Sequence, residues 1–136
     1  MKASDKIIKK LNEQPKKYAE ITQLNGGKTN LFFVENNTFW SDNLNKLNNN
    51  GYDFKLFDIL EQESYRFKDR KIPKGNARNN RLGDKNCDMD TVVGIFGYKY
   101  LNAKTGDSIL EPTHVFAAIL DWANVAKNIR GFIQFI

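Results

Sequence analysis

The N-terminal part of the chain begins with apolar residues at helical spacing. In residues 3–12, three apolar side chains fall at positions i, i+1 and i+4, and lysines occupy the opposite side. This pattern predicts an amphipathic helix. Pro15 interrupts it, because proline lacks the backbone N–H that a helix interior needs. Pro15 therefore either ends the helix or opens a second short helical turn over residues 16–21.

The next stretch predicts a strand, a helix and a second strand. Residues 31–35 form a short apolar run bounded by asparagine, which is typical of a strand. In residues 38–49, aromatic and leucine side chains recur at helical spacing, and Gly51 follows as a stop signal. Residues 52–60 alternate between apolar and charged side chains over their first half. That alternation has period two and favours a strand.

Residues 91–101 are compatible with two structures. Their β-branched residues favour a strand. However, Val92, Phe96 and Tyr100 fall on one helical face, and Asp90 is a good helix N-cap. The two glycines of this run each cost a helix about 1 kcal/mol relative to alanine, although they also allow close packing. A helix is the favoured interpretation.

The C-terminal block contains the strongest helical pattern. In residues 112–128, Val115, Ile119 and Trp122 form an apolar stripe that neighbouring apolar residues widen. A helix this apolar is expected to be buried, so it is predicted to be the core helix. An Arg-Gly pair ends it, and residues 132–136 read as a closing strand.

These elements define a predicted fold class. A buried helix followed by a short stop and a strand resembles the run from recognition helix to wing in winged-helix domains, and residues 3–21 resemble the first half of a helix-turn-helix. The same order also occurs in many unrelated α+β domains, and residues 3–21 also suit a plain surface helix. We therefore predict one small α+β domain over residues 1–136, with three to four helices and a small sheet, and a winged-helix-like arrangement as the leading architecture.

The charge of the protein is concentrated in residues 66–86. The chain carries a net charge of +5, and this segment alone has eight lysine and arginine residues against two aspartates. Proline, two glycines and four asparagines exclude a long regular helix or a central strand there, so we expect a basic irregular loop. The basic residues, which we predict to be the binding site, are Arg66, Lys68, Arg70, Lys71, Lys74, Arg78, Arg81 and Lys85.

Composition narrows the class of protein further. Cys87 is the single cysteine, so the chain can form no internal disulfide and no zinc site with two thiolates. The N-terminus lacks the apolar core of a signal peptide, and the longest apolar run, residues 115–120, is too short to span a bilayer. We expect a cytoplasmic protein without a membrane partner and without a cofactor.

Nucleic acid is the partner that the charge pattern favours. A pI near 9.3 attracts polyanions, and eight cations on one segment could neutralise several phosphates of DNA or RNA. Arg78 and Arg81 suit bidentate contacts to phosphate or guanine. Tyr65 and Phe67 lie among the charges and could stack on unpaired bases. The alternatives are a hydrated loop that keeps the protein soluble and an adaptor that binds an acidic protein.

A nuclease is the alternative from a different class. Asp84, Asp88 and Asp90 cluster beside the basic loop and could share a Mg²⁺ ion that activates water. The same aspartates also suit helix capping. A metal-free ribonuclease would need a general acid and base, and His114 is the only histidine. The sequence indicates no partner for it, so a structural role is favoured, and a non-enzymatic protein is the leading expectation.

Overall fold

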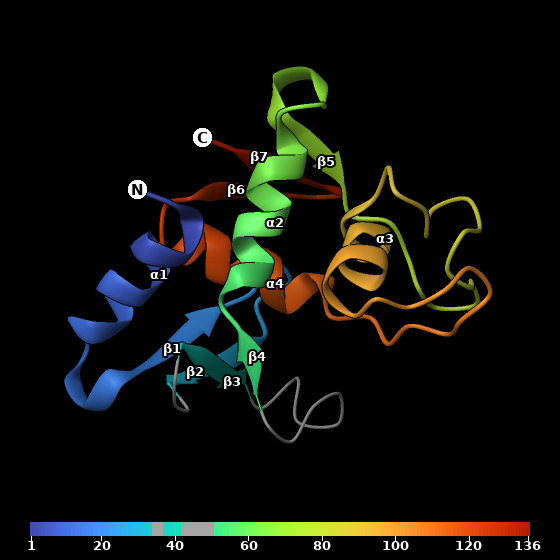
Figure 1. Cartoon of the computed structure of the whole chain (residues 1–136). Helices are drawn as coiled ribbons and strands as arrows, with labels where there is room; N and C mark the ends of the chain where they lie inside the picture. The colour runs from blue at the N-terminus through green and yellow to red at the C-terminus, as the bar shows by residue number, and fades with distance from the viewer. Residues whose placement is uncertain (34–36, 42–50) are drawn as a thin grey trace.

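The computed structural model describes residues 1–33, 37–41 and 51–136 (Figure 1). These residues form a small α+β single domain. Its α-helices are α1 (Ala3–Asn12), α2 (Lys55–Ser64), α3 (Val92–Ile95) and α4 (Thr113–Trp122). Its strands are β1 (Tyr18–Thr22), β2 (Lys28–Phe33), β3 (Thr38–Ser41), β4 (Tyr52–Asp53), β5 (Lys71–Pro73), β6 (Ala126–Ile129) and β7 (Phe132–Phe135).

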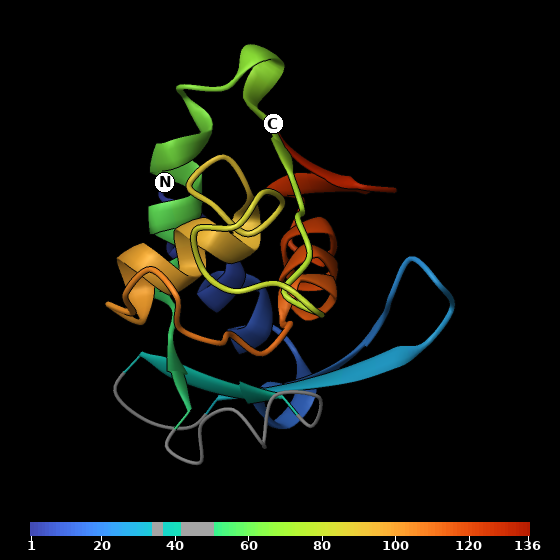
Figure 2. The same cartoon turned by 90° about the vertical axis from the view of Figure 1, so that its right-hand side faces the viewer.

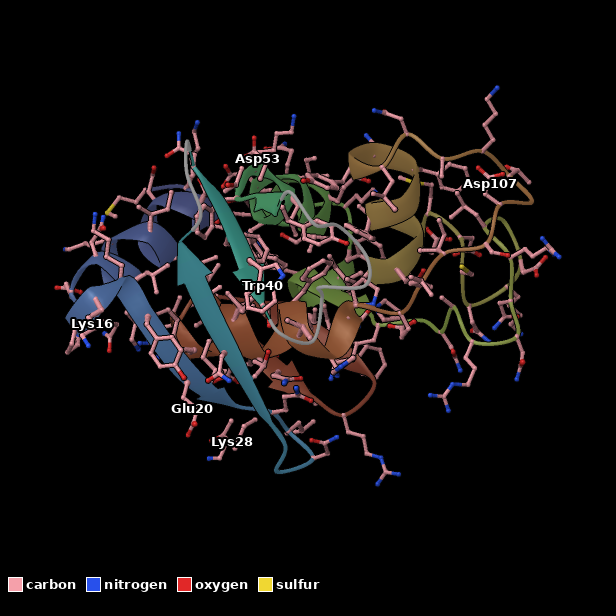
Figure 3. The ribbon with its side chains drawn as sticks, turned by 90° about the horizontal axis from the view of Figure 1, so that it is seen from below. Lys16, Glu20, Lys28, Trp40, Asp53 and Asp107 are labelled. Carbon is pink, nitrogen blue, oxygen red and sulfur yellow. The ribbon has the colours of Figure 1, made fainter. Side chains whose placement is uncertain are left out.

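Two antiparallel sheets lie at opposite ends of the helices in Figure 1. The first has the order β1-β2-β3-β4, and the second has the order β5-β7-β6. Strand β1 buries Ala19 and Ile21 and exposes the residues between them, so one face of the first sheet packs inward, where α4 contacts β1. Figure 3 views this sheet from below, with Glu20 and Trp40 on the face turned away from α4.

Helix α4 is the centre of an aromatic core. Seven of its ten residues are buried. The ring of Phe116 lies 5.0 Å from Phe96, 5.8 Å from Phe57 and 6.3 Å from Tyr52, measured between ring centroids. Burial and the neighbouring Tyr100 raise the pKa of Tyr52 to about 12, so its phenol stays neutral in this core. The aromatic contacts join the helices to the first sheet.

Several predicted elements are confirmed. Helix α1 has the predicted bounds, and β7 matches the predicted closing strand. The run 91–101 is helical: α3 continues into a π-helical segment over Phe96–Tyr100. Helix α4 is confirmed but shorter than predicted. It ends at Trp122 because Asn124 adopts a left-handed φ of 58°, after which the chain enters β6.

The predicted helical turn over residues 16–21 is wrong. Lys16 and Lys17 have φ angles of 59° and 53°, and a right-handed helix cannot continue through two left-handed residues. The chain turns sharply there and enters β1, whose buried side chains recur with period two. The first half of a helix-turn-helix is therefore absent from this part of the chain.

The two predictions around Gly51 are also wrong. The start of the predicted helix 38–49 is strand β3, which pairs with β2 and β4. Phe39 and Ser41 are buried and alternate with the less buried Thr38 and Trp40. Residues 42–49 lie outside the described residues. The predicted strand 52–60 is mostly helix α2. Its buried residues are Leu56, Phe57, Leu60 and Ser64, a helical spacing that the short initial alternation obscured. The predicted strand 31–35 is confirmed over its described part, within β2.

The winged-helix-like arrangement stays a prediction. Helix α4 does run into the β6–β7 hairpin, in the expected order. A recognition helix, however, offers a face of exposed side chains to the major groove. Within α4, the exposed residues are His114 and Asp121. In the described ranges, no helix combines the length and apolar character that crossing a bilayer requires.

Helix α3 sits directly on the loop that precedes it. The backbone N–H of Gly94 donates to Thr91 Oγ1 at 3.0 Å, and a Cβ added to Gly94 would lie 1.7 Å from the carbonyl oxygen of Asp88. Glycine is therefore required here by packing. At Gly97 a Cβ would lie 2.9 Å from a terminal methyl of Leu82, which can move.

We predict that Gly94→Ala lowers the free energy of unfolding by more than about 2 kcal/mol, because relieving the clash must displace backbone. Helix propensity alone would give the opposite sign, a gain of about 1 kcal/mol. Urea denaturation of Gly94→Ala and of the matched Gly97→Ala variant checks this. A Gly97→Ala loss equal to or greater than that of Gly94→Ala would contradict the close approach of α3 to Asp88.

Candidate nucleic-acid-binding groove

The basic residues of 66–86 fall into three groups by their contacts, and Lys74 alone forms the third. Arg66 belongs to the first group: Nε donates to Glu63 Oε1 at 3.1 Å, one terminal nitrogen donates to Asp90 Oδ1 at 3.0 Å, and the other donates to the Met89 carbonyl. Burial acts to lower the pKa of Arg66, but its bonds to Asp90 and Glu63 outweigh that effect and raise it. Arg66 thereby ties α2 to the loop before α3.

Arg70 has an equally structural position. Its Nε donates to Ser64 Oγ at 3.1 Å, a terminal nitrogen donates to the Ile136 carbonyl at 2.8 Å, and the guanidinium lies 4.1 Å from the centre of the Tyr65 ring. These contacts join the end of α2 to the end of the second sheet. The remaining terminal nitrogen is buried and has no hydrogen-bond partner among the described residues.

Two further basic residues also have partners within the protein. Lys71 Nζ lies 4.4 Å from the centre of the Phe132 ring across the β5–β7 pair. Arg81 donates to the Gly106 carbonyl at 3.2 Å. Together with Arg66 and Arg70, these residues use much of their hydrogen-bonding or stacking capacity to hold the loop against the domain.

The second group comprises Lys68, Arg78 and Lys85. Their side chains are exposed, and in the described part of the chain none of them forms a side-chain hydrogen bond, an ion pair or a ring contact. The basic loop thus contains positively charged side chains that remain available to a ligand.

Lys74 is the cation held in a recess. It follows β5, and its backbone N–H donates to the Gly131 carbonyl at 2.9 Å. Its Nζ donates to Asn128 Oδ1 at 2.6 Å. Burial lowers the pKa of Lys74, since desolvation disfavours its charged form. No carboxylate in residues 1–33, 37–41 or 51–136 forms an ion pair with it.

Two pockets meet at Lys74, and together they define the α4 groove. The larger has a volume of about 450 Å³, the smaller about 290 Å³, and both are lined by Lys74 and His114. The larger is completed by Gln23, Leu24, Asn25, Asn128, Arg130 and Gly131, and the smaller by Gly75, Asn76, Arg78, Glu111 and Thr113. Figure 2 shows the β1–β2 and β6–β7 hairpins projecting to one side of the molecule, with α4 between them.

The charges along this groove are mostly positive. Lys74, Arg78 and Arg130 are cationic, and the imidazole of His114 lines the same space. Glu111 is the acidic lining residue of the described groove. Its carboxylate accepts backbone N–H bonds from Ala77 at 2.8 Å and from Thr113 at 3.2 Å, so it is held at the start of α4.

The wall of the smaller pocket is fixed by local backbone geometry. Gly75 has a φ of 76°, and a Cβ there would lie 2.5 Å from the Asn86 carbonyl oxygen. The same carbonyl accepts the Asn76 N–H at 2.7 Å. Only glycine meets both requirements at position 75. Thr113 is 2% exposed, and within the described residues its buried hydroxyl at the start of α4 has no hydrogen-bond partner.

The three aspartates that the nuclease alternative would use have other roles in the described structure. Asp84 accepts the Arg81 N–H at 2.7 Å, Asp88 accepts the Asp90 N–H at 2.9 Å, and Asp90 pairs with Arg66. The described residues contain no group of three or more histidine, cysteine, aspartate or glutamate side chains that could hold a metal ion. Burial raises the pKa of Cys87, which makes it a poor nucleophile.

Sequence reasoning missed part of the groove. Arg130 and Asn128 were read only as the end of a helix, because their separation from Lys74 in sequence hides their proximity in space. His114 was considered without a partner, and only the fold brings Glu111 beside it. The four are brought to Lys74 by the β5–β7 pairing and by the docking of α4.

Comparison with known proteins identifies no relative of this chain. No family model matches the chain, and neither the curated proteins nor the solved structures yield a significant match. A functional proposal must therefore be based on the residues of this chain.

The division of the basic residues predicts different effects on stability. Arg70→Ala should lower the free energy of unfolding by about 2 kcal/mol, because it removes two charged hydrogen bonds and a ring contact. The matched charge removal Arg78→Ala should change it by less than about 0.5 kcal/mol. Urea denaturation measures both, and equal losses would argue against the structural role of Arg70.

Proposed function

We propose that the protein binds nucleic acid, DNA or RNA, with phosphates held in the α4 groove. The observation that carries this proposal is Lys74, a partly buried cation without a carboxylate partner in the described chain. Desolvating a charge is costly unless an opposite charge compensates it. A phosphate in the groove would supply that charge, and Arg78, Arg130 and His114 line the same space.

The exposed cations extend the contact beyond the groove. Lys68 and Lys85 lie on the basic loop with their side chains in solvent. Charges of this kind attract a polyanion over about 8 Å at physiological ionic strength. A repeating phosphate backbone can contact several such cations at once. Arg66 and Arg70 contribute indirectly, by holding the loop in place.

Salt dependence provides the test. If about six phosphates are neutralised, the logarithm of the association constant for duplex DNA should fall against the logarithm of salt concentration with a slope of roughly −5. We expect Lys74→Met combined with Arg78→Ala to reduce the magnitude of that slope by about 2. Fluorescence anisotropy with labelled duplex DNA, single-stranded DNA and single-stranded RNA measures both quantities.

The double variant Lys6→Ala/Lys9→Ala is the control, because it removes the same charge from α1. It should change the slope by less than the groove variant does. Binding that does not vary with salt would refute the proposal, and a larger effect of the control would move the site to α1. Absence of binding to all three probes would favour an acidic protein as the partner.

A further inference from the structure

We propose that the smaller pocket of the α4 groove cleaves RNA without a metal ion, with Glu111 as general base and His114 as general acid. The sequence alone indicates no partner for His114. The fold gathers Lys74, Arg78 and Glu111 with it around one recess of about 290 Å³. This inference rests on the proposed function, since the strand must first bind in the groove.

The residues of this pocket match the requirements of phosphodiester transfer. Cleavage of RNA through its 2′-hydroxyl needs a base, an acid and positive charge, and it needs no external nucleophile. Glu111 supplies a carboxylate, His114 supplies an imidazole, which is a common general acid in enzymes, and Lys74 and Arg78 supply the positive charge.

The step balances with these groups alone. Glu111 accepts the proton of the 2′-hydroxyl, and the 2′-oxygen forms a bond to phosphorus. The bond between phosphorus and the 5′-oxygen then breaks, and protonated His114 gives its proton to that oxygen. The products are a 2′,3′-cyclic phosphate and a 5′-hydroxyl. Glu111 then returns its proton to solvent, and His114 takes one from solvent.

The local structure fixes the base and leaves the acid accessible. The N–H bonds from Ala77 and Thr113 hold both oxygens of Glu111 in place, while each oxygen keeps a further lone pair. His114 is exposed in the first turn of α4, and within the described chain no hydrogen bond or ion pair engages its ring. It is therefore free to approach a leaving group.

Lys74 and Arg78 have a different part in the reaction. The pentacoordinate transition state carries more negative charge on its equatorial oxygens than the phosphodiester does. Cations that are already in position stabilise this added charge without reorganising. Lys74 is held by Asn128, and its partial burial strengthens its field in the pocket.

The test uses the whole protein and end-labelled single-stranded RNA of random sequence, in excess EDTA. We expect cleavage fragments that end in a 2′,3′-cyclic phosphate, identified by mass spectrometry. The same RNA made with 2′-deoxynucleotides should bind but remain intact. His114→Ala should slow cleavage at least about 100-fold when protein is in excess and all the RNA is bound, so that a change in affinity does not enter the rate. Lys9→Ala, on α1, is the matched control and should cleave at the wild-type rate.

Glu111→Gln should also slow cleavage at least about 100-fold. Because Glu111 caps α4, circular dichroism must show that this variant is folded; if it is not, His114→Ala decides the matter. Binding without cleavage by the wild-type protein would overturn this inference and leave the proposed function intact. Neither binding nor cleavage would overturn both. Cleavage that persists in His114→Ala, or that requires a divalent metal ion, would overturn the assignment of the pocket.

Discussion

The packing of Phe116 against Phe57, Phe96 and Tyr52 is the interaction on which the rest of the structure depends. These rings come from α4, α2, the π-helical segment and β4, so a single aromatic cluster joins elements far apart in the sequence. Because α4 is buried on almost every side, its orientation about its own axis is fixed. That orientation places His114 in the groove. The position of the Glu111 carboxylate is set by the start of the helix, because this carboxylate accepts the Thr113 N–H.

The sequence predicted the elements whose pattern is long or unambiguous. The apolar stripe of α4 and the amphipathic pattern of α1 were read correctly, because each repeats over several turns. The prediction of a strand over residues 52–60 was wrong because apolar and charged residues alternate by coincidence at its start, which obscured the helical spacing of α2. In β3 the alternation of buried and less buried residues is only four residues long. The strand forms because it pairs with β2 and β4, and not because of local propensity.

The candidate site was predictable only in part, for a different reason. Charge identified the basic segment, but eight cations look alike in a sequence. Their roles differ through contacts that only the fold creates, such as Arg70 with the Ile136 carbonyl and Lys74 with Asn128. The pairing of β5 with β7 brings residues near position 74 beside residues near position 130, and no local pattern encodes that proximity.

Lys74 is also held by its backbone on both sides: its N–H donates to Gly131, and its carbonyl accepts from Val93. Immobilising a long side chain at an interface costs about 0.5–1.5 kcal/mol of conformational entropy. For Lys74 much of this conformational entropy is already lost when the chain folds. The side chains of Lys68 and Lys85 would lose theirs only on contact with a ligand. A preorganised cation mainly prolongs the lifetime of a complex, and exposed mobile cations mainly speed its formation. In the basic segment, Lys68 and Lys85 are thus suited to fast association with an anionic ligand, and Lys74 is suited to slow dissociation.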